Sequence, residues 1–113
     1  MSVTIVLDGG IKTCCSVTST EVVEKTVREW LGESERLTII DRQAQPWEPD
    51  QLAQFAERHF HEKMFPLVYI GDTLAMLGGI PNRKNLLAMV AGQMEYGISE
   101  KDIAEAAKSM GQD

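Results

Sequence analysis

The only two cysteines of the chain are adjacent, at Cys14 and Cys15, and Ser16 follows them. Neighbouring Cα atoms are about 3.8 Å apart, which is below the usual separation in a disulfide, so a bond between these two thiols would strain the turn. Two neighbouring thiolates suit a soft, thiophilic ion better. Because the pair also precedes a predicted helix N-terminus, whose amides and dipole favour a thiolate, the same residues are candidate nucleophiles.

A third interpretation of the pair is that its thiols are idle. Free cysteine often serves as a small buried apolar residue without any chemistry. Two ligands are too few for a structural zinc site, and no nearby His or Cys completes one. The residues alone therefore leave three interpretations of the pair open: a nucleophilic thiol, two ligands of a soft ion, or idle thiols.

Pro66 is the second candidate feature, because it opens the apolar run Leu67-Val68-Tyr69-Ile70. Proline at the first position of a strand is permitted without any special role. Its place after a helix and before a hairpin nevertheless favours a cis Phe65–Pro66 bond, although cis is the minority state of X-Pro bonds. Pro81 is interpreted as an ordinary helix-start signal.

Strand and helix patterns alternate around these features. Apolar, β-rich runs predict strands at Val3 to Leu7, Leu37 to Asp41, Leu67 to Ile70 and Thr73 to Leu77, the last two joined by a Gly71-Asp72 turn. Apolar residues at helical spacing predict helices from Thr18 to Gly32, from Pro49 to about Met64, from Asn82 to about Gly92 and from Ser99 to Met110. The order β-α-β-α-β-β-α-α predicts an α/β fold with a mixed sheet and helices on both faces.

Local signals predict where these helices begin. Thr18-Ser19-Thr20-Glu21 matches a capping box in which the Thr18 hydroxyl is the N-cap. Pro49 is expected at a first helical position, and Asn82 and Ser99 are expected as N-caps. The helix that follows the cysteines is therefore expected to begin at Thr18, slightly later than it would if a cysteine stood at the helix start.

Size and charge narrow the classes of protein. A chain of 113 residues can bury one core without disulfides, and we expect a single domain. The net charge of −6 and the pI near 4.9 argue against nucleic acid or a membrane as the main partner. Met1 to Leu7 lacks a basic signal-peptide region, and the two cysteines are not a secreted disulfide framework. We expect a cytoplasmic protein with reduced thiols and no cofactor.

The order of these motifs resembles the thioredoxin-like superfamily, over residues 3 to about 92, with a C-terminal helical extension at 98–110. Two small bacterial families are similar in detail. The YuzD-type thioredoxin-like disulfide proteins share Trp30-Leu31 and the strand opening Phe65 to Val68. The arsenical-resistance metallochaperone and trans-acting repressor family shares Cys14-Cys15-Ser16, Pro66-Leu67 and the Pro-x-Arg pattern of Gly79 to Arg83.

The resemblance implies a thioredoxin-like fold with a four-stranded mixed sheet and a thiol site. Cys15 would be the nucleophile of a thiol–disulfide exchange, Cys14 would be auxiliary, and Pro66 would shape the substrate groove. Thr18 stands where a C-x-x-C motif has its resolving cysteine, so the pattern resembles a monothiol site. The partner would then be a protein or a low-molecular-weight thiol.

The metallochaperone resemblance implies a different use of Cys14 and Cys15, as ligands of a metalloid ion. That family binds trivalent arsenic with a third cysteine, and the matching position here is Thr20. A homodimer would supply the missing ligands. Two further features are left open. Trp47 is either a loop anchor or a partner contact. Arg83 and Lys84 are either a solvated helix end or an anion contact.

The histidines are given no functional role. His59 is expected to be a partly buried core residue on the apolar face of its helix. His61 projects elsewhere, and residues two apart on a helix do not converge on one metal ion.

Overall fold

A computed structural model of the chain describes residues 2–12, 16–33 and 35–109. Its main sheet has four strands in the order β4-β1-β5-β6. The strands are β1 (Ser2–Leu7), β4 (Arg36–Asp41), β5 (Leu67–Ile70) and β6 (Thr73–Leu77). β1 pairs in parallel with β4 and antiparallel with β5, and β5 pairs antiparallel with β6. The predicted α/β fold with a four-stranded mixed sheet is confirmed.

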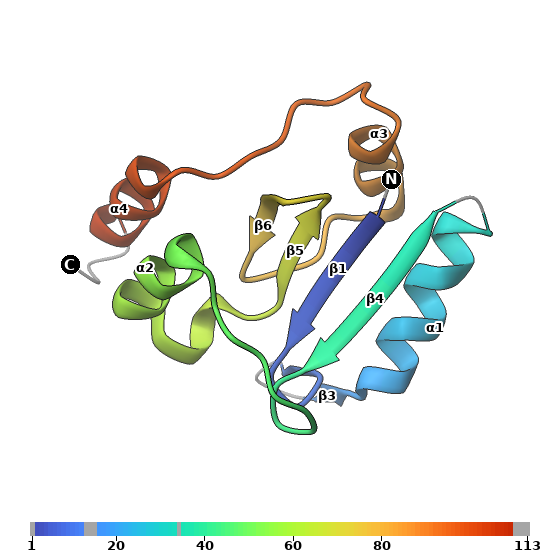
Figure 1. Cartoon of the computed structure of the whole chain (residues 1–113), viewed down its shortest axis with the longest axis horizontal. Helices are drawn as coiled ribbons and strands as arrows, with labels where there is room; N and C mark the ends of the chain where they lie inside the picture. The colour runs from blue at the N-terminus through green and yellow to red at the C-terminus, as the bar shows by residue number, and fades with distance from the viewer. Residues whose placement is uncertain (1, 13–15, 34, 110–113) are drawn as a thin grey trace.

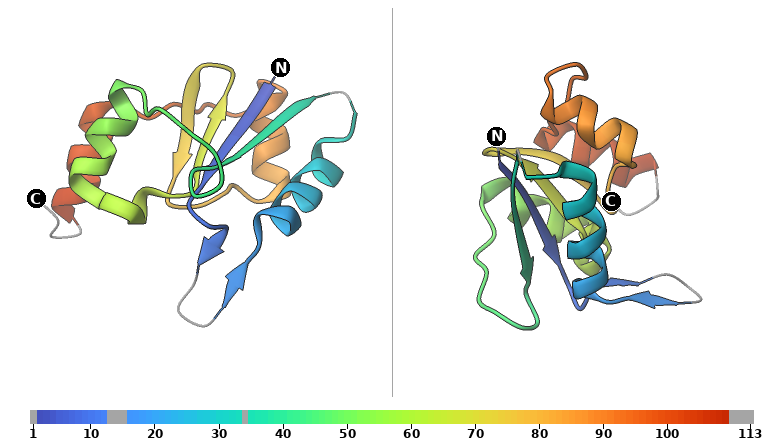
Figure 2. Two further views of the ribbon diagram at one scale, coloured as in Figure 1. Left: turned by 60° about the horizontal axis from the view of Figure 1, so that its bottom comes forward. Right: turned by 90° about the vertical axis from the view of Figure 1, so that its right-hand side faces the viewer.

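Helices cover both faces of this sheet (Figures 1 and 2). One face carries α1 (Thr20–Leu31) and α3 (Arg83–Val90), which share a core with β1, β4, β5 and β6. The other carries α2 (Gln51–Phe60), the 3-10 helix η1 (His61–Met64) and α4 (Glu100–Ser109). The predicted second helix therefore ends at Phe60 and continues as a 3-10 turn.

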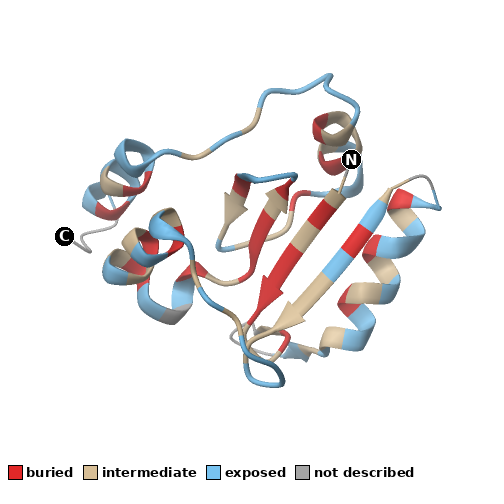
Figure 3. Ribbon diagram, viewed as in Figure 1, coloured by how far each residue is buried: buried red, intermediate tan, exposed pale blue. Residues whose placement is uncertain are grey.

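The central strand β1 supplies side chains to both cores. Val3, Ile5 and Leu7 point into the core under α1 and α3, whereas Val6 points into the core under α2 and α4. Successive side chains of a strand alternate between the faces of a sheet, so an apolar run such as Val3 to Leu7 is stable only where both faces are covered. All four of these side chains are buried, as Figure 3 shows along β1.

A short hairpin that the sequence did not predict lies between β1 and α1. Its strands are β2 (Ile11–Lys12) and β3 (Val17–Thr18), which pair antiparallel. The predicted order of strand, cysteine turn and helix is therefore incomplete, because β3 lies between the cysteines and α1. Strands of two residues are too short to show the alternation that marks a strand in a sequence.

Two predicted helix starts also need correction. The N-cap of α1 is Ser19 rather than Thr18, and its hydroxyl accepts a hydrogen bond from the Val22 amide at 3.4 Å. The N-cap of α2 is Asp50, whose carboxylate accepts from the Ala53 amide at 2.8 Å, so Pro49 precedes the helix rather than opening it. Thr18 and Ser19 have similar capping ability, which explains the first shift, and the second arises because Asp50, directly after Pro49, is itself a strong N-cap residue.

Other local predictions are confirmed. Gly32 ends α1 with a φ of 70°, and Gly71-Asp72 forms the turn between β5 and β6. Asn82 caps α3 by accepting from the Asn85 amide at 2.8 Å. Ser99 and Asp102 cap α4 reciprocally, and the hydrogen bonds from Ser99 lower the pKa of Asp102.

The last helix is part of the second core. Ile103 and Ala107 of α4 are buried against α2 and η1, and the Ile98 amide joins the preceding segment to the Leu74 carbonyl at 3.0 Å. Met110, at the predicted end of this helix, lies outside the described residues. None of the helices in the described ranges has the length and apolar character that crossing a bilayer requires.

Candidate functional site

Three chain segments meet at one edge of the sheet. The last residues of the parallel strands β1 and β4 pair as Leu7 with Asp41, and β5 begins beside them with Leu67 opposite Val6. Three parts of the chain therefore lie at the same edge. They are the segment that leads from β1 toward the cysteines, the loop after β4, and Pro66 just before β5. The carboxyl ends of strands in an α/β sheet are the usual location of ligand sites.

Pro66 is buried at the start of β5, and the predicted cis bond between Phe65 and Pro66 is confirmed. The Phe65 ring packs edge-on against Trp47, with ring centroids 5.8 Å apart. The guanidinium carbon of Arg42 lies 4.4 Å from the centroid of the same ring, in cation–π geometry. Trp47 thus anchors its loop on Phe65, which is one of the two roles left open for it.

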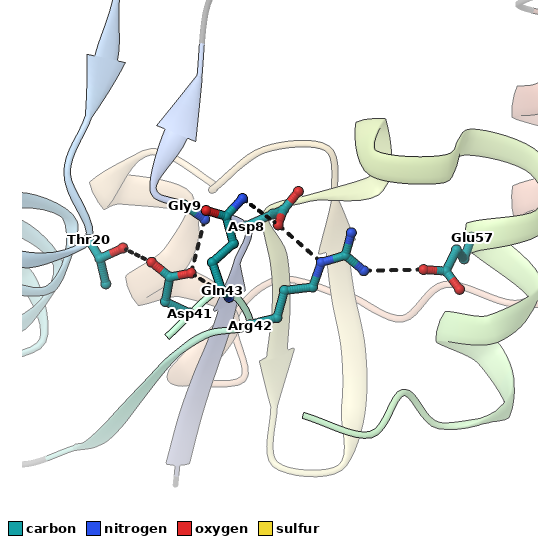
Figure 4. Close-up of polar contacts among 7 residues, drawn as sticks. All are labelled: Asp8, Gly9, Thr20, Asp41, Arg42, Gln43 and Glu57. Atoms are coloured by element: carbon teal, nitrogen blue, oxygen red, sulfur yellow. Dashed lines mark hydrogen bonds and ion pairs between the residues drawn. The ribbon is translucent and has the colours of Figure 1, made fainter. Parts of the chain in front are cut away.

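Arg42 also contacts two carboxylates, Asp8 and Glu57 (Figure 4). Its Nε donates to Asp8 Oδ1 at 3.1 Å, and its Nη1 donates to Glu57 Oε2 at 3.3 Å. Desolvation by burial lowers the pKa of Arg42, but hydrogen bonding and charge from Asp8 and then Glu57 outweigh it and raise the pKa above its usual value. The guanidinium therefore stays charged and is held by three groups from separate parts of the chain.

The Asp41 carboxylate makes a second set of contacts at this edge (Figure 4). Its Oδ1 accepts from the Gly9 amide and from the Gln43 amide, both at 3.0 Å. Its Oδ2 accepts from the Thr20 hydroxyl at 2.7 Å. A bond from an aspartate to the amide two residues later is a common turn motif, so the loop after β4 orients this side chain by itself. Asp41 thereby joins the turn after β1 to the first turn of α1.

The sequence-predicted site residues are only partly accounted for. Cys14 and Cys15 lie outside the described residues. Thr18 lies in β3 and is half-buried, and Pro66 lies at the sheet edge where Gly9 and Thr20 also meet. Gly9 precedes the cysteines in the chain and Thr20 follows them. The structure thus brings both ends of the cysteine-bearing segment to the edge that holds Pro66.

Sequence reasoning missed the polar residues of this edge, which are Asp8, Asp41, Arg42, Gln43 and Glu57. A usable signal was present, because two aspartates stand at the ends of the predicted strands, as Leu7-Asp8 and as Ile40-Asp41. Carboxylates at the carboxyl ends of parallel strands share one edge of the sheet. Glu57 carries no comparable signal, because it stands in the middle of α2.

The other candidates lie away from this edge or make structural contacts. His59 is half-buried and packs on Phe55 with ring centroids 4.8 Å apart, as expected of a core histidine. Arg83 and Lys84 are exposed in the first turn of α3. In the part of the chain that the structure describes, His, Cys, Asp and Glu side chains form no group of three or more suited to a metal ion.

An open pocket of about 290 Å³ lies on the α2 side of the sheet, lined in part by Trp47, Asp50 and Tyr69. The Tyr69 hydroxyl donates to Asp50 Oδ1 at 3.3 Å. Burial, together with the charge of Asp50 and this hydrogen bond, raises the pKa of Tyr69 well above its usual range. Since Asp50 also caps α2, this contact holds β5 against the helix start.

Comparison of the chain with models of protein families, with characterised proteins and with solved structures gives no match.

Proposed function

We propose that the chain is a thioredoxin-like thiol protein whose reactive groups are Cys14 and Cys15. The strand order β4-β1-β5-β6, with β5 antiparallel to its neighbours and helices on both faces, supports this fold. The hairpin of β2 and β3 is then an addition between the first strand and the first helix. The observation that carries the proposal is the shared edge, where Pro66 directly precedes β5 next to both ends of the cysteine-bearing segment.

The proposed reaction is thiol–disulfide exchange through a mixed disulfide. The Cys15 thiolate attacks one sulfur of a partner disulfide, an S–S bond to the partner forms, and the other partner sulfur leaves as a thiolate. An external thiolate then attacks the mixed disulfide and releases Cys15 as a thiolate. Thr18 stands at the position of a resolving cysteine, so the second thiol comes from another molecule. The partner class is a protein or low-molecular-weight disulfide, in a reducing compartment such as the cytoplasm.

The hairpin changes how such a site would promote this reaction. β3 and the Ser19 cap stand between Cys15 and α1 in the sequence, and the effect of a helix dipole falls off within about one turn. The helix N-terminus therefore stabilises a thiolate at Cys15 less than it would if α1 began directly after the cysteines. The support that remains is the shared edge, where Gly9 and Thr20 at the ends of the cysteine-bearing segment meet near Pro66.

A second candidate is a carrier or regulator that binds a thiophilic metalloid without catalysis. The hairpin favours it, because separating the pair from the helix start weakens the case for an activated nucleophile and leaves adjacent soft ligands unaffected. Two thiolates do not complete a three-ligand site, so binding would require a second chain. Cys14 and Cys15 of two copies would then share one ion.

The two candidates are separated by the variants Cys15→Ser and Cys14→Ser. Each protein is incubated with oxidised glutathione and, separately, with arsenite, and its intact mass and oligomeric state are measured. Exchange predicts a glutathione adduct that Cys15→Ser abolishes and Cys14→Ser largely retains, since one nucleophile suffices. One arsenic per two chains, lost in both variants, would instead establish the metalloid carrier. Neither adduct in the wild type would leave the thiols idle and contradict both candidates.

A further inference from the structure

Asp41 is bonded to both ends of the segment that contains the β2–β3 hairpin. Before the hairpin, Gly9 donates its amide to Oδ1 at 3.0 Å, and after it, Thr20 donates its hydroxyl to Oδ2 at 2.7 Å. The two contacts span 32 and 21 residues of sequence. One carboxylate on the sheet therefore holds the entry and the exit of the hairpin together.

The ladder of the hairpin itself is short over the residues that the structure describes. Its ladder consists of the pairs Ile11 with Thr18 and Lys12 with Val17, and an isolated two-stranded hairpin is marginal in water. Ile11 packs against the first core, whereas the Val17 side chain is 64% exposed. Attachment at the base is therefore expected to help set the hairpin's direction.

Neighbouring contacts make this base rigid. Gly10 packs so closely on the Thr18 carbonyl oxygen that a side chain at Gly10 would overlap it. The backbone amide of Gln43 donates to Asp41, and its side-chain amide donates to Asp8 at 3.1 Å. Both aspartates are therefore held by the loop after β4. Arg42 then ties Asp8 to Glu57 of α2.

We propose that Asp41 is a positioning residue for the thiol site. Its side chain fastens the base of the β2–β3 hairpin to the edge that holds Pro66. This inference rests on the proposed function for its consequence, and on the described contacts alone for the fastening. Asp41 does not react, and it acts through the hairpin. Loosening it should increase the motion of the hairpin about its base and slow exchange with a bulky disulfide, while a small alkylating reagent still reaches the thiols.

Three variants with a matched control test the fastening. Asp41→Ala removes both acceptors, and Thr20→Val removes only the hydroxyl contact. Asp41→Asn is the conservative variant, because its carbonyl can still accept from Gly9 and Gln43 while its amide donates to the Thr20 oxygen. Thr26→Val makes the same change as Thr20→Val in the same helix, but at a position away from the hairpin base.

Native-state hydrogen exchange measures the attachment directly. In Asp41→Ala the β2 and β3 amides should exchange about tenfold faster, in line with the loss of hydrogen bonds to a charged group, while the β1 amides stay unchanged. Thr20→Val should show a smaller rise, and Asp41→Asn and Thr26→Val should stay close to the wild type. Unchanged β2 and β3 exchange in Asp41→Ala would overturn the fastening.

Kinetics of the same proteins test the consequence. In Asp41→Ala, mixed-disulfide formation with a disulfide-bonded protein should fall about tenfold, while alkylation by iodoacetamide keeps its rate, and Asp41→Asn should restore most of the loss. An equal loss in both reactions would show a merely structural role and overturn the positioning. If the wild type itself forms no mixed disulfide, the proposed function fails, and the hydrogen-exchange result still decides the fastening.

Discussion

Gly10→Ala should lower the free energy of unfolding by about 2–4 kcal/mol, measured by urea denaturation. Gly10 has a φ of 89°, which side chains of L-residues rarely adopt, and its Cβ would overlap the Thr18 carbonyl oxygen. Because that oxygen belongs to the backbone of β3, it cannot move aside as a flexible side chain would. The hairpin base must shift as a whole.

Gly71→Ala separates the two causes of that loss. Gly71 also has a positive φ, of 63°, but an added Cβ would meet nothing within 4 Å. It should therefore show only the backbone penalty, about 1–2 kcal/mol. Equal losses in the two variants would mean that the close approach of Gly10 to Thr18 does not constrain the hairpin.

Ile103→Ala should lower the free energy of unfolding by about 2–5 kcal/mol, as expected for removing most of a buried side chain. Ile103 is 1% exposed and packs in the core formed by α2, η1 and α4. Urea denaturation followed by circular dichroism measures the loss in a single transition.

Val22→Ala is the control for that prediction. Val22 is also an apolar residue on a helix, but it is 53% exposed, so its truncation should change the stability by less than about 0.5 kcal/mol. An Ile103→Ala variant as stable as Val22→Ala would show that α4 adds little to the core and packs only loosely on α2.

The strands of the main sheet and the helices that cover it could be predicted because each has a local signal. Val3 to Leu7 and Leu67 to Ile70 are apolar runs between turn residues, and Asn82 and Ser99 are capping residues just ahead of helical patterns. The β2–β3 hairpin has no such signal. Ile11-Lys12 and Val17-Thr18 are strands of only two residues each, and they pair between segment ends that Asp41 joins at the sheet edge.

The polar residues of the candidate site were also harder to predict, because their contacts have no local signal in the sequence. Asp41 and Arg42 read as the end of a strand and the start of a loop, and their partners stand far away in the sequence. Asp41 reaches Gly9 across 32 residues, and Arg42 reaches Asp8 across 34. Contacts of this range follow from the parallel pairing of β1 with β4, which no local pattern encodes.

The central claim, that the fold presents Cys14 and Cys15 for disulfide exchange, is tested most directly by comparing the protein with a synthetic peptide of residues 10–19. Both contain the same two thiols in the same local sequence, and only the protein has the edge formed with Pro66. The rate of mixed-disulfide formation with a disulfide-bonded protein is measured at one pH for both. The account predicts that the folded chain reacts at least about tenfold faster, which corresponds to about 1.4 kcal/mol contributed by the fold. A folded chain that reacts no faster than the peptide would contradict it.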